Sequence, residues 1–234
     1  MILKKKVQQP DEIIINKAQQ VYKYLIAFYG LPVWRKATSP LDEMISTILS
    51  QNTNDSNRDA AYKNLHHLYP TWESVRDAPT AQIVAAIRTA GLGNQKAVRI
   101  QNILRQITAE NGALDLSFLA EMPSAQVRSW LLKFKGIGPK TTAIVMQFSL
   151  GHSAFAVDTH IYRVSGRLGL RPPTMNVEQT HEWMEKIFKP DQYGTGHLNL
   201  IRLGREICMA RKPACPGCPL RSFCNYYQNE YLSI

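Results

Sequence analysis

Two sets of residues in this sequence could carry chemistry, and the first is a group of cysteines near its end. The chain has four: Cys208, Cys215, Cys218 and Cys224. No upstream cysteine can pair with them, and a reducing compartment disfavours disulfides. Four thiols this close in sequence therefore predict one metal site. By thiolate chemistry alone, zinc and an iron–sulfur cluster fit equally well.

The second set lies in residues 136–142, which read Gly-Ile-Gly-Pro-Lys-Thr-Thr. A helix is expected to end near Phe134, and a proline directly after Gly138 suits the first turn of the next helix. Gly136 and Gly138 let a ligand approach the main chain, and the new helix offers unpaired N–H groups at its positive dipole end. This pattern predicts an anion site suited to a DNA phosphate, although it also fits a plain connection between helices.

Lys140 and Asp158 are the candidate catalytic residues. Lys140 lies in the first turn of the expected helix, where the dipole and the nearby Lys133 and Lys135 disfavour an ammonium and favour a nucleophilic amine. Asp158 precedes a further expected helix, and its carboxylate could accept a proton or stabilise positive charge on a sugar. The simpler interpretations are a phosphate contact for Lys140 and a helix N-cap for Asp158.

The elements that must position these residues are predicted to be helices almost throughout. Apolar residues recur at helical spacing from Asp11 to Tyr29, a Gly-Leu-Pro sequence ends that helix, and a second helix begins at Pro40. We find no convincing strand, repeat or low-complexity linker. The sequence therefore predicts an all-α protein with a metal-bearing tail, with further helices near residues 55–68, 80–89, 94–111, 124–134, 139–150, 160–168, 176–188 and 195–207.

The composition narrows the choice of partner. Lys and Arg total 28 against 18 Asp and Glu, and the net charge of +10 favours a polyanionic partner. No apolar run approaches the ~20 residues that a membrane span needs, and the basic start lacks the apolar core of a signal peptide. We therefore expect an intracellular protein, in the cytoplasm or nucleoid if prokaryotic, that acts on nucleic acid and not on membranes.

Three features together resemble the helix-hairpin-helix DNA glycosylases of the endonuclease III type. Gly-Ile-Gly-Pro-Lys-Thr at residues 136–141 is followed by Val-Asp-Thr-His at 157–160. The spacing Cys-x6-Cys-x2-Cys-x5-Cys is similar to the cluster loop of that family, and Gly-Leu-Gly-Asn-Gln-Lys-Ala at 91–97 is similar to a DNA-facing loop. The cluster-loop resemblance implies that the four cysteines hold a 4Fe–4S cluster.

The resemblance also implies a fold and a partner. The fold is an all-α, two-domain helix-hairpin-helix glycosylase with a DNA cleft between the domains and a C-terminal 4Fe–4S cluster loop. A six-helix domain would cover residues 32–152, and an iron–sulfur domain would join residues 1–31 to 153–234. The partner would be double-stranded DNA containing a damaged base or abasic site, bound by a monomer.

The implied activity is that of a bifunctional base-excision enzyme. Lys140 would attack C1′ of a flipped-out nucleotide, Asp158 would stabilise charge on the sugar, and β-elimination through a Schiff base would cut the strand. An oxidised pyrimidine is the expected lesion. The alternatives are a monofunctional glycosylase for mismatched uracil, thymine or adenine, and a non-enzymatic helix-hairpin-helix DNA-binding protein.

The resemblance places two residues in the gap that a flipped nucleotide leaves. Asn52 stands at the plug position of the family, where endonuclease III usually carries Gln, and the adjacent Gln51 is the competing assignment. Leu92 matches an apolar wedge, with a buried core leucine as the alternative.

Further DNA contacts are expected from the hairpin and from the cluster loop. His160 would either orient Asp158 or only pack. A proline at position 139, where many members have a basic residue, leaves the choice of lesion open. The expected contacts are Lys135, Gly136, Gly138, Arg211 and Lys212.

Overall fold

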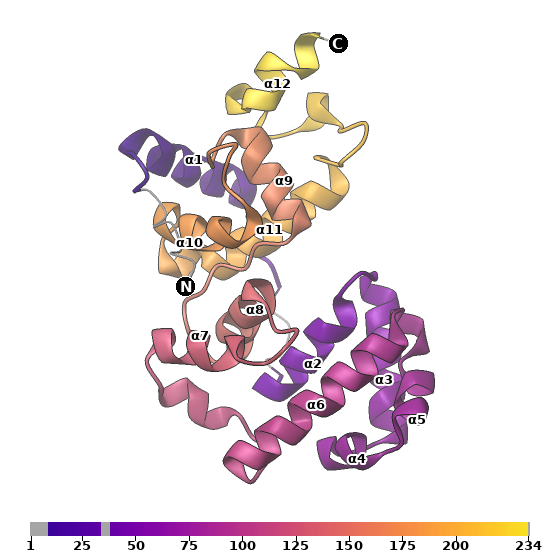
Figure 1. Cartoon of the computed structure of the whole chain (residues 1–234). Helices are drawn as coiled ribbons and strands as arrows, with labels where there is room; N and C mark the ends of the chain where they lie inside the picture. Colours follow the sequence, from indigo (N-terminus) through magenta and orange to yellow (C-terminus); the bar gives the residue numbers. More distant parts are fainter. Residues whose placement is uncertain (1–8, 34–37, 234) are drawn as a thin grey trace. The chain divides into compact units, whose positions relative to one another are not determined.

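The computed structural model describes residues 9–33 and 38–233, and within these ranges every regular element is an α-helix or a 3₁₀ helix. The all-α prediction is therefore confirmed. The described residues form two compact units, 38–152 and 9–33 with 153–233. We call them the hairpin unit and the cluster unit, and Figure 1 shows the helices of each. Nowhere in the described ranges is a helix both long enough and apolar enough to cross a membrane.

The hairpin unit contains seven α-helices in its described residues, one more than the sequence predicted. The additional helix is α4, six residues long, and it begins with a capping box in which Thr71 and Ser74 bond each other's backbone N–H groups. Helix α2 packs against α8, and α6 packs against α4 and α5. The helices are α2 (Pro40–Ser50), α3 (Asp55–Leu68), α4 (Trp72–Asp77), α5 (Thr80–Ala86), α6 (Gly93–Asn111), α7 (Ser124–Leu132) and α8 (Pro139–Ser149).

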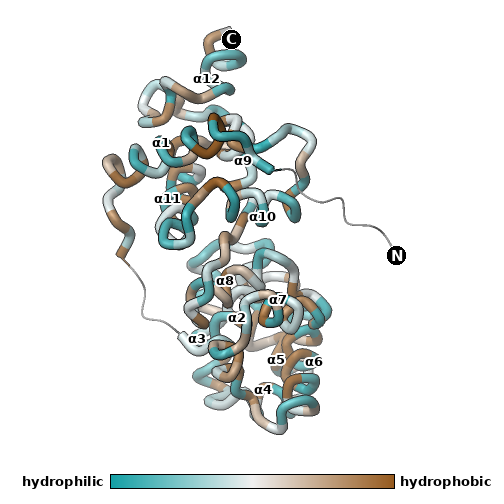
Figure 2. The backbone as a smooth tube through the Cα atoms, turned by 90° about the vertical axis from the view of Figure 1, so that its left-hand side faces the viewer, coloured by the Kyte–Doolittle hydropathy of each residue, from teal (hydrophilic) through white to brown (hydrophobic). Residues whose placement is uncertain are grey.

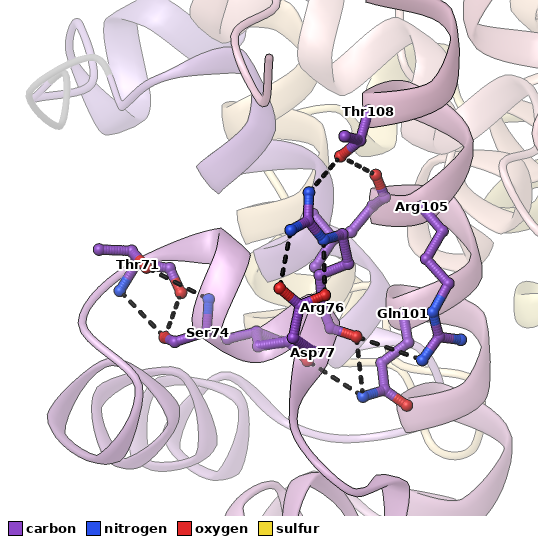
Figure 3. Close-up of polar contacts among 9 residues, drawn as sticks. Thr71, Ser74, Arg76, Asp77, Gln101, Arg105 and Thr108 are labelled. Carbon is purple, nitrogen blue, oxygen red and sulfur yellow. Dashed lines mark hydrogen bonds and ion pairs between the residues drawn. The ribbon is translucent and has the colours of Figure 1, made fainter. Parts of the chain in front are cut away.

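Polar side chains hold the middle and C-terminal half of helix α6 in place (Figure 3). The buried Gln101 donates its Nε2 to the carbonyl oxygen of Ala78 at 2.7 Å. Arg76 donates to the hydroxyl of Thr108 at 3.0 Å, and Arg105 donates to the carbonyl of Arg76 at 3.2 Å. These bonds tie α4 and the turn after it to the middle and C-terminal half of α6.

The cluster unit is built on α1 (Glu12–Tyr29), α9 (Thr159–Leu168), α10 (Val177–Ile187), α11 (Tyr193–Glu206) and α12 (Asn225–Asn229). Helix α1 packs on α10 and α11, and α9 packs on α11. Ala18, Val21 and Leu25 follow one another at helical spacing and are fully buried on the inner face of α1. Figure 2 shows hydrophobic and hydrophilic residues mixed along the helices of each unit, as amphipathic helices require.

The boundary between the units after α1 differs from the one that the sequence suggested. Residues 32 and 33, which we expected at the start of the six-helix domain, belong to the cluster unit. The amide of Asn199 on α11 donates to the carbonyl of Gly30 at 3.1 Å and so ties the chain after α1 to the cluster unit. A hydrogen bond between residues 169 positions apart leaves no signal in local sequence.

Candidate functional site

The turn between α7 and α8 offers main-chain N–H groups to an anion. Gly136 has a φ of +94°, in the left-handed region that glycine tolerates. Gly138 is the N-cap of α8, and no described side chain caps that helix. Because the first N–H groups of α8 lack intrahelical partners, they can donate to a phosphate at the positive end of the helix dipole.

The three lysines around this turn have different surroundings. Lys140, in the first turn of α8, and Lys135 are exposed, and neither forms a hydrogen bond or an ion pair with a described residue. Lys133 instead pairs with Glu110, and its Nζ lies 4.2 Å from the centroid of the Trp130 ring. The sequence suggested that the charges of both Lys133 and Lys135 act on Lys140, but the charge of Lys133 is already paired. Lys135 and Lys140 remain available.

The two glycines of the turn predict different effects of substitution. A Cβ built on Gly136 would lie 2.2 Å from Nε of Arg99, whereas one on Gly138 meets nothing within 4 Å and φ there is not positive. Gly136→Ala should therefore destabilise the protein by about 1–2 kcal/mol. Gly138→Ala should lower the midpoint of thermal unfolding less than Gly136→Ala does, since it loses only the N-cap preference for glycine, yet it should weaken DNA binding because its methyl group blocks a phosphate. Thermal unfolding and DNA titration of both variants test this, and normal DNA affinity of Gly138→Ala would argue against the phosphate site.

Three non-glycine residues in the described ranges have a positive φ: Asn52 (54°), Leu92 (51°) and Lys212 (49°). All three are among the DNA contacts expected from the sequence, and all three are exposed. The leucine is 48% exposed, which rules out the alternative of a buried core residue. A left-handed backbone costs Leu92 and Lys212 about 1–2 kcal/mol each, whereas asparagine adopts it readily, and strain of this kind is concentrated at functional sites.

Gln51 and Asn52 are neighbours, but only the side chain of Gln51 is held by hydrogen bonds. The Oε1 of Gln51 accepts a hydrogen bond from Arg99, and its Nε2 lies 3.5 Å from the carbonyl oxygen of Gly136. Asn52 is exposed, and its side chain has no hydrogen bond with a described residue. Of the two side chains, that of Asn52 is therefore free to reach out toward DNA, while that of Gln51 is held by its hydrogen bonds.

Asp158 begins α9 in the cluster unit. Its Oδ1 accepts the N–H of Ile161 at 2.8 Å, so the carboxylate is an N-cap, as its simpler interpretation predicted. The residue is 9% exposed, and the other carboxylate oxygen has no hydrogen bond with a described residue. One oxygen thus holds the helix while the second can face a reacting group. His197 fixes the segment before Asp158 through a 2.8 Å contact between its Nδ1 and the carbonyl oxygen of Ala156.

One ring nitrogen of His160 is engaged by an arginine and not by this carboxylate. Its Nδ1 accepts from Nη2 of Arg163 at 3.1 Å, and the same nitrogen of Arg163 donates to the carbonyl of Gly204 at 2.8 Å. No hydrogen bond joins His160 to Asp158 among the described residues. These contacts fit the packing role for His160.

The four cysteines line a single cavity, which they share with apolar side chains of α9 and α11 such as Val164, Leu168 and Leu203. Among the described residues, no three His, Cys, Asp or Glu side chains are grouped closely enough to hold a single metal ion. Four thiols spread around a cavity suit a cluster of several iron and sulfide atoms better than one zinc ion. The donor set therefore fits an iron–sulfur cluster.

Two arginines of α9, not identified from the sequence, anchor the cluster loop. Arg167 donates to the carbonyls of Met209 at 2.6 Å and Ala210 at 3.0 Å, and its Nη1 lies 3.4 Å from Sγ of Cys208. Arg163 donates from Nε to the carbonyl of Cys208 at 3.0 Å. Helix α9 thus has Asp158 as its N-cap, and Arg167 near its other end contacts the cluster loop.

Burial controls the protonation of the cluster thiols. It raises the pKa of Cys218 to about 11, and it raises the pKa of Cys215 and Cys224 as well. Without bound iron these thiols keep their protons at neutral pH. Because ligation needs thiolates, binding of the cluster releases protons.

Two protein-family models match two parts of the chain. The model of the HhH-GPD superfamily of base excision DNA repair proteins matches residues 45–190. The iron–sulfur binding domain of endonuclease III matches residues 208–224, which include all four cysteines. The chain is also 35% identical to endonuclease III of Thermotoga maritima over 195 residues, which are 83% of this chain and 87% of that protein.

Two solved structures of endonuclease III have a similar fold. One is a non-covalent complex with DNA, with a TM-score of 0.81, 26% identity and coverage of 93% of this chain and 98% of that chain. The other is a covalent intermediate trapped with DNA, with a TM-score of 0.78, 28% identity and coverage of 90% and 97%. The match to the cluster domain confirms the iron–sulfur cofactor. The chain belongs to the endonuclease III family of DNA glycosylase/AP lyases, base excision repair enzymes of the HhH-GPD superfamily.

Proposed function

We propose that this DNA glycosylase/AP lyase uses Lys140 as its nucleophile and Asp158 as the carboxylate that assists it. The amine of Lys140 forms a bond to C1′ of the damaged nucleotide while the glycosidic bond breaks, and the base leaves with the electron pair and takes up a proton. Asp158 stabilises the positive charge that develops on the sugar. The observation that carries the proposal is an exposed, unpaired lysine in the first turn of α8, beside free main-chain N–H groups.

The lyase step then follows from the same lysine. Opening of the sugar ring leaves a Schiff base between Nζ of Lys140 and C1′, which acidifies the proton on C2′. Removal of that proton and departure of the 3′ phosphate oxygen break the strand on the 3′ side. Hydrolysis of the Schiff base returns the amine.

We further propose that this chain contacts DNA at four places. The hairpin binds a phosphate through residues 136–140 with Lys135, and the cluster loop adds phosphate contacts through Arg211 and Lys212. Asn52 fills the gap left by the flipped nucleotide, and Leu92 inserts as an apolar wedge into the base stack of the duplex. The exposed positions and positive φ of Asn52, Leu92 and Lys212 support this assignment.

The proposed substrate is duplex DNA with an oxidised pyrimidine, bound by one copy of the chain inside the cell. Purified, cluster-loaded protein should release thymine glycol from a duplex and leave the strand cut before any heat or alkali treatment. A set of matched duplexes with thymine glycol, mismatched uracil, mismatched thymine or mismatched adenine tests the choice of lesion. Base release that leaves the backbone intact would show a monofunctional glycosylase, and binding without base release would show a non-enzymatic protein.

A further inference from the structure

Near its start, helix α6 carries a lysine whose charge is buried. Lys96 is 2% exposed, and its Nζ donates to the carbonyl oxygens of Leu49 at 2.8 Å and Ala90 at 2.7 Å. Both carbonyls lie at the ends of helices, α2 and the 3₁₀ helix Arg88–Ala90, where the helix dipole is negative. Burial and the charge of Arg99 lower the pKa of Lys96. A lysine is almost never buried without partners such as these.

The two carbonyls belong to the two segments of this unit that carry a non-glycine residue with a positive φ. Leu49 stands three positions before Asn52 (φ 54°), and Ala90 stands two positions before Leu92 (φ 51°). Strained conformations persist only where the surrounding structure holds them firmly. The single ammonium of Lys96 fixes the start of both segments, so it sets their positions relative to each other.

One turn further along α6, Arg99 links the first of these segments to the hairpin. It donates to Oε1 of Gln51, whose Nε2 lies 3.5 Å from the carbonyl oxygen of Gly136. The guanidinium also occupies the space next to Gly136, where a Cβ would be 2.2 Å from Nε. Arg99, Gln51 and Gly136 thus form one polar contact group.

We propose that Lys96 and Arg99 are positioning residues that hold the plug segment at Asn52, the wedge segment at Leu92 and the phosphate-binding hairpin in one fixed arrangement for DNA. The proposal rests on the DNA contacts assigned above. Neither cation touches the reacting atoms. Their loss should therefore impair opening of the duplex more than it impairs chemistry at a site that is already open.

The main test replaces Arg99 by methionine, which keeps the length of the side chain and removes its charge and donors. Arg105→Met is the matched control, because Arg105 lies on the same helix, is exposed, and donates to Asn102 of that helix and to the carbonyl of Arg76, away from the segments at Asn52 and Leu92. The probe is a duplex with a tetrahydrofuran abasic analogue opposite 2-aminopurine, whose fluorescence reports local unstacking without any cleavage. A second assay measures cutting at an abasic site in single-stranded DNA, which needs no plug or wedge.

At saturating protein, Arg99→Met should lose most of the fluorescence change and should act about tenfold more slowly on a damaged duplex. Its cutting of the single strand, which needs the hairpin but neither plug nor wedge, should fall several-fold less than its activity on the duplex. Arg105→Met should behave as the native chain in both assays. Equal losses of Arg99→Met in both assays, or no loss in either, would overturn the proposal. If the native chain opens the probe but excises no oxidised pyrimidine, the assignment of the lesion has failed and the positioning role stands.

A second test compares Gln51→Met, Arg99→Met and the double variant that carries both changes. It measures the coupling between the two side chains, so a loss of stability in one variant does not decide the outcome. Since both side chains act through the same contact, the double variant should lose no more fluorescence change than Arg99→Met alone. Additive losses would show that the two residues act independently and would contradict the coupling. Lys96→Met should give the same pattern as Arg99→Met, and a pattern like that of Arg105→Met would remove Lys96 from the proposal.

Discussion

Lys140→Ala should lose the covalent adduct that borohydride traps on duplex DNA with one abasic site, and its strand cutting should fall at least about a thousandfold. The reason is that the amine supplies the bond to C1′ and no other described lysine stands in the first turn of α8. DNA affinity should change little, since the main-chain N–H groups of the hairpin remain. Gel analysis of the trapped adduct and single-turnover cutting measure the effect.

Lys135→Ala is the matched control for this variant. Lys135 is a second exposed lysine of the same hairpin, also without a partner among the described residues. Loss of the Lys135 side chain should weaken DNA binding without slowing any chemical step. The adduct should therefore still form at saturating protein. An adduct of normal yield from Lys140→Ala would remove Lys140 from the mechanism, and loss of the adduct in Lys135→Ala alone would move the nucleophile to Lys135.

Asp158→Asn should slow release of the base by about 10²–10⁴-fold while the protein stays as stable as the native chain. Asparagine caps helices as well as aspartate does, so the hydrogen bond to Ile161 at the start of α9 can persist. Only the negative charge is lost, and with it the stabilisation of the sugar cation. Single-turnover excision and thermal unfolding, measured on the same preparation, separate the two effects.

Asp158→Ala completes the comparison because it removes the cap together with the charge. It should release the base as slowly as Asp158→Asn and should in addition lose about 1 kcal/mol of stability. Iron content and visible absorbance should stay normal in both variants, which checks that α9 still supports the cluster loop. If Asp158→Asn excised the base at the native rate, the carboxylate would be a helix cap and nothing more.

The amino-acid sequence determines those features that depend on short stretches of chain. The cysteine spacing predicts the metal loop, since all four ligands lie between residues 208 and 224. The glycines and proline of residues 136–139 predict the turn and the start of α8, because they act on the local backbone. Helical periodicity and caps likewise predict most helices, and they miss only short ones such as α4, whose six residues carry little periodicity.

Only the tertiary structure decides which side chains are free and which are engaged. Lys133 and Lys135 read alike in the sequence and both are exposed, yet a glutamate 23 positions away pairs with Lys133, while Lys135 has no partner among the described residues. Gln51 and Asn52 are separated in the same way, by a bond from Arg99 that spans 48 positions.

The roles proposed for Lys96, Arg99 and Arg167 also come from such contacts. A buried lysine and an exposed lysine cannot be distinguished in the sequence. Burial depends on elements that come together only when the chain folds. Long-range hydrogen bonds to backbone carbonyls, as from Lys96 to Leu49 across 47 positions, depend on no particular side chain at the acceptor. For that physical reason they leave no pattern in the sequence that local chemistry could reveal.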